Sequence, residues 1–268
     1  MADDLHDICD DLAAEHQALD ALVADLDDAG WATPTPSEGW AVRDQIGHLA
    51  FFDETGTQAI VDPAGFTADV EALFADPAAF MDRAVGRGRA LSPADLLAWW
   101  REARAALVAV ARPLDPRARL PWYGPPMGGR SFITARLMET WAHGQDVADA
   151  LGVQRVPTDR LRHIAFLGVR TRGFSYVVRD REAPAGEVRV ELTGPGGDVW
   201  EWGDPSAADR ISGPALDFCL VVTQRRNVTD TTLDVSGPLA VEWMGIAQAF
   251  AGGPTLGPAP STDLAAGR

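Results

Sequence analysis

The most constraining feature of this sequence is the stretch 131–151, S-F-I-T-A-R-L-M-E-T-W-A-H-G-Q-D-V-A-D-A-L, which Gly152 follows. Apolar residues recur in it at intervals of three and four, which is the pattern of an amphipathic helix with a buried face. Ser131 is a favourable N-cap, and Gly152 suits the position just past a C-terminus. We therefore expect a helix over this stretch, and any fold for the chain must bury one side of it.

Two polar residues of this helix, Glu139 and His143, stand four positions apart and so lie one above the other on a single face. Asp146 follows three residues later, close to the same face. A carboxylate and an imidazole among apolar neighbours are costly to bury unless something pairs them, and a divalent metal ion does so. A Glu–His hydrogen bond or two solvated side chains would explain the pattern equally well. This helix alone leaves the choice open.

A third candidate ligand lies in a second predicted helix, which begins near Val42 in the segment A-V-R-D-Q-I-G-H-L-A-F-F-D-E-T-G. His48 stands beside Leu49, near the apolar edge of that helix. Taken alone, such a histidine is usually a core residue with a hydrogen-bond partner. Together with Glu139 and His143, it completes a His, Glu, His set, which supplies the three protein ligands of an open metal site.

The charge of the chain excludes several classes of function. The formal net charge is −16, which argues against a nucleic-acid backbone or an anionic membrane as partner. Every basic residue is arginine, because the sequence contains no lysine. Schiff-base chemistry and the Walker-type phosphate loop both require lysine and are therefore excluded.

The composition fits a globular protein of the cytoplasm. Hydrophobic residues make up 46% of the 268 residues, yet no apolar run approaches the roughly 20 residues that span a bilayer. The acidic start M-A-D-D-L-H-D lacks the features of a signal peptide. The two cysteines, Cys9 and Cys219, lie far apart in sequence, which agrees with a reducing compartment; both are expected to pack rather than react.

The first half of the chain predicts a bundle of four long helices with long connections. Two prolines exclude helix from the connector 31–40, and short helical pieces are expected within the surface connection 62–92. The aromatic loop 119–130 could either brace the bundle or form the wall of a pocket, with a slight preference for the wall. The long helices are expected at 3–29, from 42 onward, at about 93–111 and at 131–151.

The second half changes in character after residue 152. A helix over 158–176 is followed by alternating segments at 187–192 and 199–203, typical of strands. A helix at 215–225, a short strand at 232–235 and a last helix at 238–250 complete a small α+β unit. The expected plan is thus a helical bundle at 1–152, a linker helix with the α+β domain at 153–252, and a disordered tail at 253–268.

Two segments carry a family resemblance, G-W-A-V-R-D-Q-I-G-H-L at 39–49 and M-E-T-W-A-H-G-Q-D at 138–146. At this separation they resemble the DinB-like bundle superfamily and, within it, the mycothiol-dependent maleylpyruvate isomerase group. The resemblance implies that His48, Glu139 and His143 bind a metal. Two imidazoles and one carboxylate favour zinc first, with nickel, iron and manganese as alternatives. The resemblance also implies a mycothiol-type thiol as cofactor and, from a weaker match, a sterol-carrier-like fold for the C-terminal part.

Three functions follow as expectations. The first is an isomerase or transferase that uses a small-molecule thiol to act on a small electrophile. The second is a metal-dependent hydrolase that uses bound water, and the third is a protein that binds metal or a small ligand without turnover. Asp146 is expected to orient an imidazole or carry a proton, although a plain surface role is as plausible. Arg225 and Arg226 are expected to bind a carboxylate in a cleft between the domains, or else to be solvated. A homodimer is left open.

Overall fold

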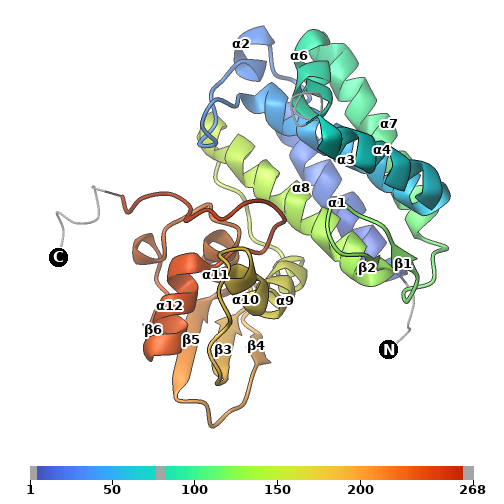
Figure 1. Ribbon diagram of the computed structural model, residues 1–268. Coiled ribbons are helices and arrows are strands. Elements are labelled where there is room, and N and C mark those ends of the chain that lie inside the picture. Colours follow the sequence, from blue (N-terminus) through green and yellow to red (C-terminus); the bar gives the residue numbers. More distant parts are fainter. Residues whose placement is uncertain (1–4, 77–81, 262–268) are drawn as a thin grey trace. The chain divides into compact units, whose positions relative to one another are not determined.

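The computed structural model describes residues 5–76 and 82–261 (Figure 1). Two compact units divide the chain, residues 1–155 and residues 156–268, whereas the composition suggested a boundary at 152. The first unit is helical, and the second contains a mixed sheet with helices. At this level, the expectation of a helical N-terminal part followed by an α+β part is confirmed.

Four long helices make up most of the first unit. Helix α3 packs along α7 and α8, and α1 packs along α8 and α7. Their bounds are α1 His6–Val23, α3 Val42–Val61, α7 Pro93–Ala111 and α8 Gly129–Leu151. The shorter elements are α2 Asp28–Trp31, α4 Pro63–Ala75, the π-helical turn η1 Asp82–Gly86, α6 Arg87–Ala90, and a two-stranded ribbon of β1 Arg119–Leu120 and β2 Met127–Gly128.

The helix bounds follow local rules that the sequence shows in part. Pro93 opens α7 after Ser92, whose hydroxyl accepts a hydrogen bond from the backbone N–H of Asp95 at 3.2 Å. The helix expected at 3–29 ends instead at Val23, because Asp27 caps a separate turn, α2, by accepting from Gly30 N at 2.8 Å. Within the connection 62–92, where short helical pieces were expected, residues 77–81 lie outside the described residues.

The prediction that Ser131 caps the organising helix is wrong. Helix α8 begins two residues earlier, at Gly129, and Gly128 is its N-cap. The preceding loop makes this start stable, since Gly129 N donates to Ala118 O at 2.9 Å and Arg130 N donates to Pro116 O at 3.3 Å. The other end agrees with the prediction, because Gly152 follows the helix with a left-handed φ of 65°.

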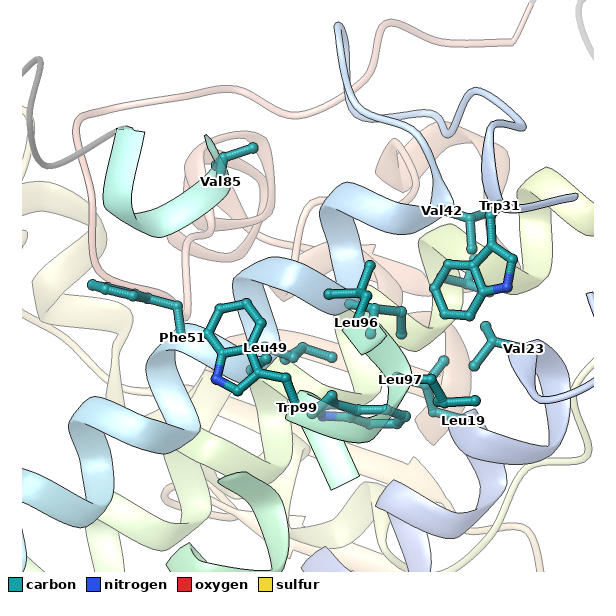
Figure 2. Close-up of a cluster of buried hydrophobic side chains, with 14 of the residues drawn as sticks. Leu19, Val23, Trp31, Val42, Leu49, Phe51, Val85, Leu96, Leu97 and Trp99 are labelled. Atoms are coloured by element: carbon teal, nitrogen blue, oxygen red, sulfur yellow. The ribbon is translucent and has the colours of Figure 1, made fainter. Parts of the chain in front are cut away.

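An apolar core joins the helices of the first unit. Figure 2 shows side chains from α1, α3 and α7 in this cluster, with Trp31 of α2 and Val85 of η1 on opposite sides of it. Leu49 is fully buried at the centre of this cluster, and burying a side chain of that size contributes about 1.5–3 kcal/mol. This core holds α3, the helix that carries His48, in place against α7.

The second unit has a four-stranded mixed sheet of order β4-β3-β5-β6. Strand β3 pairs antiparallel with β4 and parallel with β5, and β5 pairs antiparallel with β6. Helices α11 and α12 pack against β5. The elements are α9 Leu161–Arg170, α10 Arg172–Val177, β3 Val188–Thr193, β4 Val199–Trp202, β5 Asp209–Pro214, α11 Ala215–Val222, the 3-10 turn η2 Val228–Asp230, β6 Asp234–Ser236 and α12 Pro238–Ile246.

Several expectations for the second unit need correction. The sequence did not predict β5, although this strand is central in the sheet. The helix expected at 158–176 is divided between α9 and α10 at Thr171. The helix expected at 215–225 ends at Val222, because the chain turns at Gln224, whose φ is 60°.

The described part of the C-terminal tail makes hydrogen bonds to the rest of the second unit. Residues 253–261 run along the second unit, where Gln224 Nε2 donates to Thr255 O at 2.8 Å and Asn227 Nδ2 donates to Pro258 O at 3.0 Å. Ser261 N donates to the Asp230 carboxylate at 2.9 Å. Residues 262–268 lie outside the described part of the chain.

Within residues 5–76 and 82–261, no helix is both long enough and apolar enough to cross a membrane.

Candidate metal centre

Two neighbouring helices bring the three predicted ligands together. His48 belongs to α3, and Glu139 and His143 belong to successive turns of α8. The apolar faces that pack α3 against α8 therefore also set the position of His48 opposite the other two side chains. His143 is buried, whereas His48 and Glu139 keep part of their side chains exposed. The site is thus open on one side.

The three side chains converge on one point through single atoms. The Oε2 of Glu139 lies 3.2 Å from His143 Nε2 and 3.8 Å from His48 Nε2. One potential ligand atom from each residue falls within 4.8 Å of the others, so the three residues could hold a metal ion. Two ligand atoms that each lie about 2 Å from one ion stand roughly 3–4 Å apart, and the two separations from Glu139 Oε2 fit that requirement.

The charges in this cluster suit a cation. Burial lowers the pKa of His48 to about 4, and the neighbouring His143 lowers it further in the same direction. Burial raises the pKa of Glu139, but hydrogen bonding to His143 and His48 outweighs it and holds that pKa well below its usual range. Near neutral pH, the cluster therefore presents an ionised carboxylate beside a neutral imidazole, the protonation states that metal ligands require.

A compact connector between α2 and α3 lies over the site. Its ends are tied by the pairing of Pro34 with Ala41 and by a hydrogen bond from Val42 N to Thr33 O at 3.0 Å. Trp40, near its end, stacks on His143 with ring centroids 5.9 Å apart and planes at 14°, and it also contacts His48 at 5.3 Å. Trp40 therefore packs on both histidines of the triad.

A buried glutamine links this connector to the triad. Gln45 of α3 is fully buried, and its Oε1 lies 2.5 Å from His143 Nδ1. Its Nε2 donates to Thr35 Oγ1 at 2.8 Å, and Thr35 Oγ1 donates to Trp40 O at 3.0 Å. Gln45 was not among the residues predicted for the site. The available signal was its position three residues before His48, on the same side of the helix.

The aromatic loop 119–130 reaches the site through one ring. Phe52 of α3 contacts His48, with ring centroids 4.6 Å apart, and Tyr123 of the loop contacts Phe52 at 5.3 Å. Trp122 stacks on Phe66 of α4 at 5.6 Å with planes at 2°. The loop therefore braces α3 and α4, and through Phe52 it also supports one side of His48.

Comparison with known proteins places the chain in a family. Residues 12–148, which include the whole triad, match the family described as the mycothiol maleylpyruvate isomerase N-terminal domain. The chain belongs to this family.

Two relatives from Mycobacterium tuberculosis resemble the chain along most of its length. They are MT0041 of strain CDC 1551 / Oshkosh and Rv0036c of strain ATCC 25618 / H37Rv, each 50% identical over 247 residues. The aligned region covers 92% of this chain and 96% of each relative. Both relatives are described as uncharacterized, so they extend the family without adding an activity.

Two crystal structures of the mycothiol-dependent maleylpyruvate isomerase share the fold. A mutant with alanine in place of a histidine superposes with a TM-score of 0.58, and the second structure gives 0.54. Each comparison covers 88% of this chain and 95% of the other, at 14% sequence identity. At that identity, the similarity establishes the fold alone.

The structure places Asp146 beside the triad of this family member. Asp146 is buried, and its Oδ2 accepts a hydrogen bond from Ser37 Oγ at 3.2 Å. The same oxygen lies 3.9 Å from His143 Nδ1, whereas Gln45 Oε1 lies 2.5 Å from that nitrogen. The orienting and proton-carrying roles of Asp146 both stay predictions.

Arg225 and Arg226 belong to the second unit. They follow the end of α11 rather than lying within it, and their backbone N–H groups donate to Leu220 O at 2.8 Å and 3.2 Å. Arg226 also lines a small pocket of that unit with Gln224 and Met244. Their catalytic role stays a prediction.

A second buried polar cluster lies on the ligand-bearing helices. Arg136 of α8 donates through Nε and Nη2 to Asp53 Oδ1 of α3 at 3.1 Å and 2.8 Å. His16 of α1 lies nearby, with Nε2 3.5 Å from Asp53 Oδ2. All three side chains are at least 97% buried, so this cluster is a structural tie between three helices rather than part of the open site.

Proposed function

We propose that this chain is a metal-dependent enzyme that uses a low-molecular-weight thiol of the mycothiol type to isomerise or conjugate a small electrophilic substrate. The observation that carries this proposal is the convergence of His48, Glu139 and His143 within 4.8 Å on neighbouring helices. Family membership supports it, because the family is described by a mycothiol-dependent isomerase. We also propose that the first unit is a DinB-like bundle and that the second unit has a sterol-carrier-like fold.

The donor set favours zinc, with nickel, iron or manganese as alternatives. Two imidazoles and one carboxylate leave at least one coordination position open, and a bound ion of this kind would hold a small thiol as its thiolate. Glu139 contributes the negative charge and His48 and His143 the neutral donors. Trp40 and Phe52 exclude water from the faces of the two imidazoles that they cover.

The protein's own thiols are poorly suited to be the nucleophile. Burial raises the pKa of Cys9 to about 11 and raises the pKa of Cys219 further. Cys9 is on α1 and Cys219 on α11, and both side chains are buried. A thiol-dependent reaction therefore requires a thiol supplied by a small molecule, and the cytoplasm is the proposed location because thiols are kept reduced there.

Asp146, Arg225 and Arg226 complete the proposal as candidate catalytic residues. Asp146 is a buried carboxylate near the triad and could carry a proton. The two arginines could bind a carboxylate on the substrate or thiol. The proposed partners are the thiol and the electrophile, with neither nucleic acid nor membrane, and a homodimer is the assembly to check.

Elemental analysis of the purified protein, followed by a thiol-conjugation screen, tests the proposal. We expect about one divalent ion per chain, and we expect His143→Ala to lose it while helix content is kept. Gln145→Ala, which changes an amide two residues away that bonds to Asp149, is the control. If His143→Ala keeps its full metal content, His143 is not a ligand and the proposed metal site is wrong.

The screen separates the three candidate functions. Turnover that requires an added thiol supports the proposal, turnover without thiol indicates the hydrolase, and stoichiometric metal without any turnover indicates a binding protein. Arg225→Ala and Arg226→Ala extend the screen to the second unit. If either arginine binds substrate, its variant keeps the metal and loses roughly 10–100-fold in turnover, as expected for loss of a charge-assisted contact.

A further inference from the structure

A chain of hydrogen bonds lies behind His143. It runs from Trp40 O through Thr35 Oγ1 and the Gln45 amide to His143 Nδ1. Gln45 has no exposed surface, so water does not compete for its amide. The remaining ring nitrogen, His143 Nε2, is the one that faces Glu139 at 3.2 Å. One end of the imidazole is thus held by the protein, and the other is offered to the open site.

The directions of the hydrogen bonds determine where the proton lies. A threonine hydroxyl has a single hydrogen, and that of Thr35 is donated to Trp40 O. Thr35 Oγ1 therefore accepts from the Gln45 NH₂ group, which turns the Gln45 carbonyl oxygen toward His143. A carbonyl oxygen can only accept, so His143 Nδ1 must carry a hydrogen. In the neutral ring, Nε2 then has a free lone pair that points at the Glu139 carboxylate.

At 3.2 Å, this lone pair and the Glu139 carboxylate repel each other unless a positive charge, either a second ring proton or a metal ion, lies between them. A metal ion is such a charge, and it would bind Nε2 of His143 and Oε2 of Glu139 together. We propose that Gln45 is a positioning residue that keeps the proton of His143 on Nδ1 and so reserves Nε2 for the metal ion. This inference rests on the proposed metal-dependent function and adds a residue to it.

Metal affinity tests the consequence of this arrangement. Gln45→Leu keeps the volume but removes the acceptor, and we expect it to weaken zinc binding 10–100-fold in a chelator competition. Gln45→Glu keeps an acceptor at the same place and should retain affinity within a few-fold of the unmodified protein. Gln58→Leu is the matched control, because Gln58 is on the same helix and its amide bonds instead to Asp69. Circular dichroism shows that each variant is folded.

Two affinity results would overturn the proposal. Gln45→Leu could bind zinc as tightly as Gln58→Leu does, in which case the acceptor has no effect on the site. Alternatively, Gln45→Glu could lose as much affinity as Gln45→Leu, in which case the shape of the side chain matters and its acceptor does not.

Nitrogen-15 NMR of the metal-free protein tests the proton position directly, even if a variant does not fold. At mildly alkaline pH, where an ordinary imidazole is neutral, we expect His143 Nδ1 to be protonated. An unprotonated Nδ1 would overturn the proposal. Failure of the proposed function and failure of the role of Gln45 are distinguishable. Absence of stoichiometric metal in the unmodified protein would contradict the proposed function, whereas the NMR spectrum of the metal-free protein still tests the role of Gln45.

Discussion

Asp53 and Arg136 illustrate how much depends on single buried charges in this bundle. Burial raises the pKa of Asp53, but Arg136 and then His16 outweigh it and hold that pKa below its usual value, so Asp53 is an ion in the core. Its Oδ2 has no hydrogen-bond partner of its own and lies near His16 Nε2. Arg136 is therefore the main compensation for a carboxylate without solvent contact.

Removing one partner of the Asp53–Arg136 pair should lower the free energy of unfolding far more than removing both partners. We expect Arg136→Met to lower the free energy of unfolding by about 3–5 kcal/mol, because it leaves the Asp53 charge buried and unpaired. The double variant Asp53→Leu, Arg136→Met should recover most of that loss. Urea denaturation measures both. A single variant within about 1 kcal/mol of the unmodified protein would show that the core compensates this charge in another way.

The residues of the candidate site divide by how they could be recognised from sequence. Glu139 and His143 share a helix and a spacing of four, so periodicity alone puts them on one face. His48 could be added as the third ligand because it lies near the apolar edge of its own helix and completes a His, Glu, His set. Gln45 and Thr35 could not be found in this way, because their roles depend on the folded position of the 31–40 connector, and neutral amides and hydroxyls are common at such positions without any function.

Helices α1 and α7 are joined by the carboxylate of Asp20. Asp20 of α1 accepts from Arg101 Nε at 2.8 Å, and it also bonds to Arg104 Nη2 at 2.5 Å. The hydrogen bond from Arg101 lowers the pKa of Asp20, with Arg104 acting in the same direction. Because the folded-state pKa is lowered, this pair stabilises the fold above the unfolded-state pKa of about 4 and ceases to do so as the pH falls through the folded-state value.

Asp20→Asn tests this contribution. Near neutral pH, we expect the variant to be less stable than the unmodified protein by about 1–2 kcal/mol, since the charged acceptor of two arginines is lost. Below the folded-state pKa the difference should disappear, because the native Asp20 is then also uncharged. Thermal unfolding followed across this pH range measures the effect. An equal loss of stability at all pH values would mean that Asp20 acts by shape and not by charge.

The elements also show where periodicity succeeds and fails. Helix α7 has a proline and a serine cap at its start and was predicted at its observed bounds. Helix α8 begins before the predicted cap, Ser131. The backbone carbonyls of Pro116 and Ala118, more than ten residues earlier in the chain, accept hydrogen bonds from its first N–H groups. Strand β5, D-R-I-S-G-P, has a single strand-favouring apolar residue, Ile211, so no alternation is visible, and its Gly213 has a φ of 140°. Its central place comes from pairing with β3, which no local pattern reveals.

The whole molecule is very acidic and contains no lysine, so trypsin can cut it only after arginine. The order of tryptic cuts in limited proteolysis therefore reports which arginines lie in accessible backbone. Arg181 begins the exposed irregular segment before β3, whereas Arg136 lies inside α8 with its side chain bound to Asp53. Cleavage requires a stretch of backbone to leave its hydrogen bonds, which is far easier in an irregular segment than in a packed helix.

We therefore expect early tryptic cuts after Arg181 and late cuts after Arg136. The fragments from a time course, identified by mass spectrometry, give the order. Arg130 is the informative comparison, because it is exposed in the first turn of the same helix as Arg136. If the fold of α8 protects it, cleavage after Arg130 should precede cleavage after Arg136. Early cleavage after Arg136 would mean that α8 opens readily, and a helix that opens readily could not keep Glu139 and His143 in place for a metal ion.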